Sequence, residues 1–149
     1  MSFTYTYPRP AVTVDCVVLF RNDSTIRVLL IKRKHPPFEN HWAFPGGFVD
    51  MDEDLEAAAA RELEEETGLS GLKLKQFHTY GDPLRDPRHR TITVVYTSFT
   101  DDELLCKAGD DAVEAQWFDC VHLPALAFDH QKILTAVLNH FSTDKKLND

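Results

Sequence analysis

The stretch "GGFVDMDEDLEAAAARELEEETGL", residues 46–69, concentrates the charge of this chain. The 149 residues carry 24 acids and 16 bases, yet nine of the acids and only one base, Arg61, lie between Asp50 and Glu66. The remaining sequence holds fifteen of each sign, so the formal charge of −8 belongs to this one segment. Such a cluster requires a compensating positive charge, because like charges on neighbouring helical turns repel one another and destabilise the helix.

The second half of this stretch has the pattern of a helix. Gly68 ends the pattern, since glycine is a frequent helix stop. An apolar stripe at helical spacing supports the prediction and consists of Leu55, Ala58, Ala59 and Leu63. We therefore expect a helix over 54–67, whose small alanines let it approach a neighbouring layer closely.

Three glutamates of the predicted helix, Glu62, Glu65 and Glu66, have the spacing that directs side chains to one side. Carboxylate oxygens are the ligands that magnesium, manganese and calcium prefer. The alternative is an acidic helix whose carboxylates simply face water, as runs of charged residues usually do. The surroundings favour metal: Gly46 and Gly47 let backbone carbonyls come close to an ion, and Arg61 can orient a carboxylate by bidentate contact.

The composition bounds the class of protein. The length suits one domain with one core, and 43% hydrophobic and 27% charged residues are typical of a globular chain. A pI near 5.3 disfavours a general nucleic-acid binder. Three widely spaced cysteines predict free thiols and a reducing cytoplasm, and we expect neither a signal peptide nor a membrane span.

Strand and helix patterns alternate along the chain without a regular rhythm. We predict strands at 11–20, 26–34, 72–80, 91–99 and 112–120, helices at 54–67 and about 129–141, and irregular loops at 35–47 and 81–90. This order predicts an α/β (α+β) fold in which helices pack against a mixed sheet.

The spacing of fixed residues within 47–69 resembles the Nudix box. Five residues separate Gly47 from Glu53, and seven more lead to Arg61 and Glu62. The sequence Leu63, Glu64, Glu65, Glu66, Thr67, Gly68 and Leu69 then completes the signature at every defined position. The order of predicted elements over roughly 11–141 is also similar to a Nudix domain.

The resemblance implies a single Nudix hydrolase domain over 1–149, built as an α/β/α sandwich with a mixed sheet between helices. It implies hydrolysis of a nucleoside diphosphate linked to another group, with two or three Mg²⁺ or Mn²⁺ ions. Glu62 and Glu66 would ligate metal, and Glu65 would ligate metal or help to activate water. The backbone carbonyl of Gly46 would complete a shell, while Arg61 and Glu53 would form the pair that orients a catalytic glutamate. That last pair completes the catalytic set of five residues, Glu53, Arg61, Glu62, Glu65 and Glu66.

Such a site works by general physical chemistry. A coordinated divalent cation lowers the pKa of bound water, so that hydroxide forms near neutral pH. In-line attack on phosphorus is then assisted by cations that stabilise charge on the phosphate oxygens.

The loop "GDPLRDPRHR", residues 81–90, points to a subgroup. A proline at the place of Pro83, fifteen residues after Gly68, is similar to the ADP-ribose pyrophosphatase subgroup. Arg85, Arg88 and Arg90 supply guanidinium groups suited to phosphate or ribose oxygens. The alternatives are an exposed basic loop and a proline that only shapes a turn.

Two further segments contribute candidate residues. Phe44, His41 and Trp42 could stack on a nucleotide base or line the pocket that holds it. Core packing is nevertheless the expected role of Trp42. Nudix enzymes often recruit one more acid from the region of 108–118, and we favour Glu114 over Asp111, with Asp110 the third candidate there. A turn followed by a strand would explain that region equally well.

The leading hypothesis is hydrolysis of ADP-ribose to AMP and ribose 5-phosphate. Another nucleotide substrate is the first alternative: an oxidised nucleoside triphosphate, a dinucleotide or a sugar nucleotide. A second is an ADP-ribose sensor that does not cleave its ligand, which we consider less favoured because every box acid is intact and only "STDKKLND" follows Phe141. A third alternative is an acidic interaction module.

We expect a small-molecule nucleotide partner, no nucleic acid, no membrane, and a possible homodimer using the aromatic segment 3–7.

Overall fold

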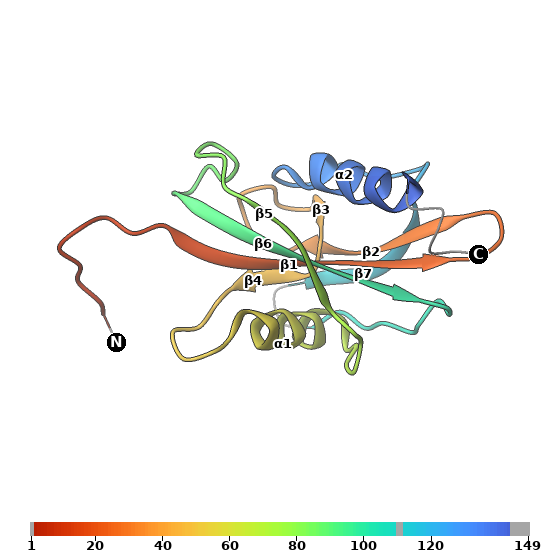
Figure 1. The fold of residues 1–149 in the computed structure, drawn as a ribbon, viewed down its shortest axis with the longest axis horizontal. Coiled ribbons are helices and arrows are strands. Elements are labelled where there is room, and N and C mark those ends of the chain that lie inside the picture. The colour runs from red at the N-terminus through yellow and green to blue at the C-terminus, as the bar shows by residue number, and fades with distance from the viewer. Residues whose placement is uncertain (1, 110–111, 144–149) are drawn as a thin grey trace.

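A seven-stranded mixed sheet lies between two helices in the computed structural model, which describes residues 2–109 and 112–143 (Figure 1). The strands are β1 (Ala11–Arg21), β2 (Ile26–Arg33), β3 (Trp42–Ala43), β4 (Gly46–Phe48), β5 (Lys75–Tyr80), β6 (Thr91–Thr100) and β7 (Ala112–Asp119). The helices of the described residues are α1 (Leu55–Thr67) and α2 (His130–Thr143), one on each face. The predicted α/β/α sandwich is therefore confirmed.

The longest strand, β1, holds the centre of the sheet. It runs parallel to β6 in a register that extends from Ala11 opposite Thr91 to Phe20 opposite Thr100. It pairs antiparallel with β2 and, at its beginning, with β4. The strands β3 and β7 extend the sheet beyond β2, and β5 extends it beyond β6. This arrangement brings the start of β1, the end of β2 and the glycines of β4 together.

Both faces of β1 are buried, which explains its nearly continuous apolar sequence. Val14 and Val18 belong to the core cluster beneath α1, whereas Val17 and Leu19 belong to the cluster beneath α2. Successive side chains of a strand point to opposite faces, so Asp15 belongs to the α2 face with the odd-numbered residues. A charged residue thus interrupts a strand that is otherwise apolar.

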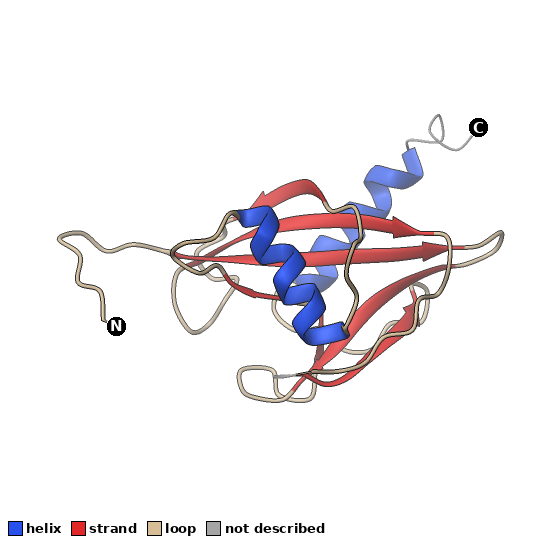
Figure 2. Ribbon diagram, turned by 90° about the horizontal axis from the view of Figure 1, so that it is seen from below, coloured by secondary structure: helices blue, strands red, loops and turns tan. Residues whose placement is uncertain are grey.

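The helix α1 packs closely on the sheet and lies diagonally across the strands (Figure 2). Ala58 and Ala59 are completely buried, and the Cys16 thiol donates a hydrogen bond to the Ala59 carbonyl at 3.4 Å. Gly68 ends the helix in the left-handed conformation, with φ of 77°, and its N–H donates to the Glu64 carbonyl. The predicted helix, its stop and the role of its alanines are confirmed.

The predicted loop 35–47 differs from the structure, because it contains β3 and the beginning of β4. Both strands are very short and flank Pro45, so neither has the length over which an alternating pattern becomes recognisable. The strand predicted at 72–80 begins only at Lys75.

The three cysteines are free thiols, as expected. No helix in the described part of the chain combines the length and apolar character needed to cross a membrane.

Candidate active site

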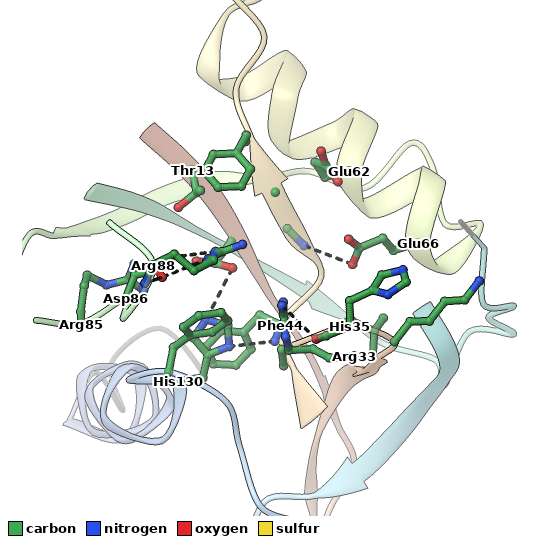
Figure 3. Close-up of a pocket in the computed structure, with 18 of the residues that line it drawn as sticks. Thr13, Arg33, His35, Phe44, Glu62, Glu66, Arg85, Asp86, Arg88 and His130 are labelled. Carbon is green, nitrogen blue, oxygen red and sulfur yellow. Dashed lines mark hydrogen bonds and ion pairs between the residues drawn. The ribbon is translucent and has the colours of Figure 1, made fainter. Parts of the chain in front are cut away.

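A cleft of about 430 Å³ opens between α1, the end of β2 and the loop that joins β5 to β6 (Figure 3). Its acidic wall carries Glu62 and Glu66 from α1, and its basic wall carries Arg85 and Arg88 from the loop. Phe44, between β3 and β4, and residues of the central strands form its floor. Sites of opposite charge on facing walls suit a ligand that joins cations to phosphate groups.

The acidic wall depends on the turn geometry of α1. Glu62 and Glu66 are one turn apart and face the cleft, with 13% of the Glu62 side chain and 9% of Glu66 exposed. Glu65 is more exposed, at 42% of its side chain, and is not among the cleft-lining residues. At about 100° per residue, Glu65 is rotated roughly 100° away from Glu66 around the helix axis. The expectation that all three glutamates face one way therefore holds only for two.

The two glycines of β4 give these carboxylates their space. A Cβ atom at Gly47 would lie 2.5 Å from Oε1 of Glu62, so any side chain there would displace that carboxylate. The Gly46 N–H donates to Oε2 of Glu66 at 3.4 Å, which brings the second carboxylate against the glycine backbone. A Cβ at Gly46 would also meet Oδ1 of Asp15 at 2.6 Å. Gly47 is required by the close approach of the backbone to a carboxylate, and Gly46 also by the Val14 carbonyl oxygen of the neighbouring strand, which a Cβ would meet first.

Arg61 organises the acids around it. Its guanidinium donates to both oxygens of Glu53, at 2.9 and 2.6 Å, and to Oε1 of Glu62 at 2.9 Å. The same side chain reaches Glu65 at 3.2 Å and the Phe48 carbonyl at 3.1 Å. The hydrogen bonds from Arg61, together with one from the Asp50 N–H, lower the pKa of Glu53 from 4.5 to about 2. The expected Arg61–Glu53 pair is present and holds Glu62 in place.

The electrostatics of Glu62 reflect its position. Burial raises the pKa of this carboxyl, and the hydrogen bond and charge of Arg61 oppose that effect. A second cation at the cleft-facing side would favour the carboxylate form further, because an opposite charge stabilises it.

The chemistry of the acidic wall fits a divalent cation. Two carboxylates face the cleft beside a backbone that has no side chains to obstruct it. Within residues 2–109 and 112–143, no three His, Cys, Asp or Glu side chains converge closely enough to hold an ion by themselves. Magnesium commonly takes only one or two carboxylates and fills its shell with water and substrate phosphate oxygens. A cation would be held here by Glu62 and Glu66, with backbone oxygen at Gly46 as the predicted third donor.

The arginines of the basic wall have different environments. Arg85 is only 9% exposed and forms two hydrogen bonds, of 3.0 and 2.7 Å, to the Asp129 carboxylate that precedes α2. Arg88 keeps 34% of its side chain exposed and makes two hydrogen bonds to Asp86. Burial raises the pKa of Asp86, but the hydrogen bonds from Arg88 outweigh it and the pKa is lowered. Arg88 is therefore available to a ligand, and Arg85 mainly ties the loop to α2.

Arg33 at the end of β2 also lines the cleft, and the sequence reading did not select it. Its guanidinium lies 4.9 Å from the centre of the Phe128 ring, and the guanidinium of Arg88 lies 5.4 Å from the same ring. Arg88 also lies 5.2 Å from the ring of Phe48. Burial lowers the pKa of Arg33, and the like charge of Arg88 lowers it further. Two repelling guanidinium groups at one cleft form a site that an anion would stabilise.

Asp15 and His130 form the polar part of the floor, and the sequence reading selected neither. Asp15 is 7% exposed and His130 3%, and the two come from β1 and from the first residue of α2. The only sequence signal was a charged residue inside an apolar strand, which is rarely buried without a role. His130 had no local signal, because its neighbours here are distant in sequence.

The other candidates from the sequence differ in position. Phe44 lines the cleft, which was one of its two predicted roles, and its ring is 2% exposed and stacks on His130 at 4.5 Å. Pro83 is exposed and lies outside the cleft lining, in a turn closed by the Arg85 N–H and the Asp82 carbonyl. Trp42 packs edge-on against Phe118, as its expected core role requires.

The candidates for the distal acid lie outside the cleft lining or outside the described residues. Glu114 is exposed on β7 and is not among the residues that line the cleft. Asp110 and Asp111 lie outside the described residues. Arg90, the third loop arginine, donates to the Gly81 carbonyl and likewise is not part of the lining.

Comparisons with known proteins agree with this geometry. A family model described as the NUDIX domain matches residues 9–137. Over 129 residues the chain is 46% identical to an ADP-ribose pyrophosphatase from Methanocaldococcus jannaschii, covering 86% of this chain and 73% of that protein. It is 34% identical to the ADPR responsive transcriptional repressor NtrR of Acinetobacter baylyi, covering 86% of this chain and only 53% of the repressor.

A solved structure extends the likeness to three dimensions. The NUDIX domain of Shewanella oneidensis NrtR, in a cocrystal with ADP ribose, matches with a TM-score of 0.84 at 31% identity. The match covers 91% of this chain and 90% of that domain. From the box on α1, the cleft beside it and these matches, we conclude that the chain belongs to the NUDIX family and is a Nudix pyrophosphohydrolase.

Proposed function

We propose that this protein hydrolyses ADP-ribose to AMP and ribose 5-phosphate. The observation that carries the proposal is the cleft in which Glu62 and Glu66 of the box face Arg85 and Arg88 of the 81–90 loop. A pyrophosphate between two ribose groups matches these walls, because its oxygens can bind both metal and guanidinium groups. The similarity to an ADP-ribose pyrophosphatase over most of the chain supports the choice of substrate.

The acidic wall is the proposed metal site. Glu62 and Glu66 hold Mg²⁺ or Mn²⁺ together with the Gly46 carbonyl, in a site of two or three ions that supplies activated water and charge neutralisation when loaded. Arg61 keeps the Glu62 carboxylate oriented toward the cleft through their 2.9 Å hydrogen bond. Glu65 joins the ligand set by leaving its 3.2 Å contact with Arg61, and Glu114 remains the candidate for a distal acid.

The basic wall is the proposed phosphate site. Arg88 is oriented by its bidentate contact with Asp86, and Arg33 by a 2.8 Å hydrogen bond to the Pro37 carbonyl. Their guanidinium groups bind phosphate oxygens, and the charge of the phosphate removes the repulsion between them. Positioning of the pyrophosphate between fixed charges contributes to catalysis, since little covalent chemistry by the protein is required.

A substrate panel tests the proposal. ADP-ribose, NADH, sugar nucleotides and oxidised dGTP are each incubated with Mg²⁺ or Mn²⁺, and the products are separated by chromatography. We expect the highest kcat/KM for ADP-ribose, with AMP and ribose 5-phosphate as products. A clear preference for triphosphates would overturn the substrate assignment. Calorimetry with each metal, with and without AMP, should show saturable uptake that a simple acidic interaction surface would lack.

A second function is favoured by a different observation. The chain is similar to the repressor NtrR and to the ADP-ribose-bound domain of NrtR, so an ADP-ribose sensor is the alternative. Saturable binding of ADP-ribose without turnover under any metal would select the sensor. In that case, binding of DNA would be the next measurement.

We also propose a cytoplasmic homodimer. The aromatic N-terminal segment extends away from the body of the domain (Figure 1). Within it, Phe3 stacks on Tyr5, the guanidinium of Arg9 lies 3.9 Å from the Tyr5 ring, and Tyr7 is 78% exposed. Sedimentation of the full chain and of a variant lacking residues 2–9 tests this proposal. We expect a dimer that becomes monomeric on removal of the segment, and an unchanged mass would contradict it.

A further inference from the structure

The floor of the cleft contains a buried acceptor and a buried donor that the Nudix box does not include. Oδ2 of Asp15 accepts a 2.6 Å hydrogen bond from the hydroxyl of Thr93. Oδ1 lies 3.6 Å from Nε2 of His130, which is beyond hydrogen-bond distance. Both residues line the cleft, and His130 is labelled in Figure 3.

The proton on His130 has a defined position. The backbone N–H of Phe44 donates to Nδ1 of His130 at 3.1 Å, so this nitrogen is the acceptor of a neutral imidazole. The Phe44 ring stacks on the imidazole and restricts its rotation. Burial lowers the pKa of His130, although the charge of Asp15 opposes this effect. Nε2 therefore carries the proton and presents it beside Oδ1 of Asp15.

This pair has the chemistry of a hydroxyl site. A hydroxyl oxygen that contacts both groups from one side can accept from Nε2–H of His130 and donate to Oδ1 of Asp15. A phosphate oxygen would satisfy the histidine but would face a buried carboxylate of the same charge. An ammonium group would satisfy the carboxylate but would face another donor. A hydroxyl matches both partners.

We propose that Asp15 and His130 form a subsite that binds a ribose hydroxyl of the substrate. This inference rests on the proposed function and extends it, because it names residues that select a sugar over an additional terminal phosphate. Gly46 keeps the subsite open, since a side chain there would meet Oδ1 of Asp15 at 2.6 Å. The box metal ligands thus select pyrophosphate, and the floor selects the sugar attached to it.

The test compares ligands that differ by one hydroxyl. Calorimetry measures the binding of AMP, 2′-deoxy-AMP and 3′-deoxy-AMP, and of ribose 5-phosphate and 2-deoxyribose 5-phosphate. In the wild-type protein, removal of the bound hydroxyl should weaken binding by about 10-fold or more, because a hydrogen bond to a buried charge is lost. Equal binding of all ligands within each set, or no binding of any, would overturn the subsite.

The variant Asp15→Asn assigns the effect to this pair. Thr93 continues to donate to the amide oxygen, so the amide NH₂ replaces Oδ1 and faces Nε2–H of His130 with a second donor. We expect the discrimination against the deoxy ligand to fall below about 3-fold. Asp23→Asn makes the same chemical change in an exposed turn outside the cleft and should retain the full discrimination.

The outcomes separate this inference from the proposed function. Discrimination that persists in Asp15→Asn would assign the hydroxyl to another residue and overturn the subsite. If Asp15→Asn does not fold, the wild-type comparison alone decides. Failure to hydrolyse ADP-ribose would overturn the proposed function, whereas these binding measurements require no turnover.

Discussion

Arg61 and Glu53 are joined by two hydrogen bonds, Nε to Oε2 at 2.9 Å and Nη2 to Oε1 at 2.6 Å. This bidentate contact connects the loop before α1 to the helix and fixes the guanidinium plane, whose remaining nitrogen reaches Glu62 at 2.9 Å. The pair acts on the site through Glu62. The following predictions separate residues that touch the ligand from residues that position them.

Glu66→Gln should reduce kcat by about 100-fold or more while the protein remains folded, because even residues that only support metal ligands cost 10–100-fold. Steady-state kinetics and circular dichroism measure the two effects. Glu64→Gln is the control, since Glu64 is an exposed acid of the same helix outside the cleft. Near-normal turnover in Glu66→Gln would mean that its role is assigned wrongly.

Arg61→Lys should lower kcat/KM by about 10–100-fold, because a lysine keeps the charge but cannot span two carboxylates with a planar fork. Metal affinity measured by calorimetry should fall with it. If activity follows charge alone, the lysine variant will retain wild-type kinetics, and the positioning role will be excluded.

Gly47→Ala should lower kcat by about 100-fold, because the new Cβ would lie 2.5 Å from Oε1 of Glu62 and small displacements of catalytic groups are costly. Gly81→Ala is the control, since its Cβ would meet its nearest neighbour at 3.9 Å. A crystal structure of the variant would show the moved carboxylate. Equal activity of the two variants would contradict the expected clash.

Replacement of Arg85 should mainly affect stability, whereas replacement of Arg88 should mainly affect substrate binding. Arg85→Ala should lower the free energy of unfolding by about 3 kcal/mol, because it leaves the carboxylate of Asp129 without its buried partner. Arg88→Ala should mainly raise KM, because its side chain is more exposed and faces the cleft. Denaturant unfolding and steady-state kinetics measure both quantities. The reverse pattern would exchange the two roles.

The stability of the protein should depend on Glu53 below pH 4.5. Its pKa is about 2 in the folded protein and 4.5 ordinarily, so the unfolded chain binds more protons in this range. Stability from this group is present above pH 4.5 and is lost as the pH falls toward 2. The unfolding free energy of the wild type should therefore decrease more steeply with falling pH than that of Glu53→Gln. The difference in slope corresponds to the uptake of at most about one extra proton per molecule on unfolding. Parallel curves between pH 4.5 and 2 would contradict the prediction.

The local parts of this site are readable from the sequence. Helix α1 and its stop at Gly68 follow from spacing within a single short segment, whereas the pairing of Arg61 with Glu53 follows from the resemblance of that segment to the Nudix box. The orientation of Glu65 does not follow so directly, because residues three apart on a helix share a side only approximately. The short strands β3 and β4 were missed because two or three residues cannot display a period.

The sequence by itself determined the box, the acidic helix and the kind of ligand that its charge requires, because these depend on neighbours within a few turns. Tertiary structure alone decided that Arg85 is held by Asp129, just before α2, and that Arg88 keeps more of its side chain exposed at the cleft. It also brought Phe44 to His130, which are 86 residues apart, and placed Asp15 of β1 beside them. Contacts of this kind depend on sheet register and on the face to which each side chain points, and neither is encoded by a local pattern.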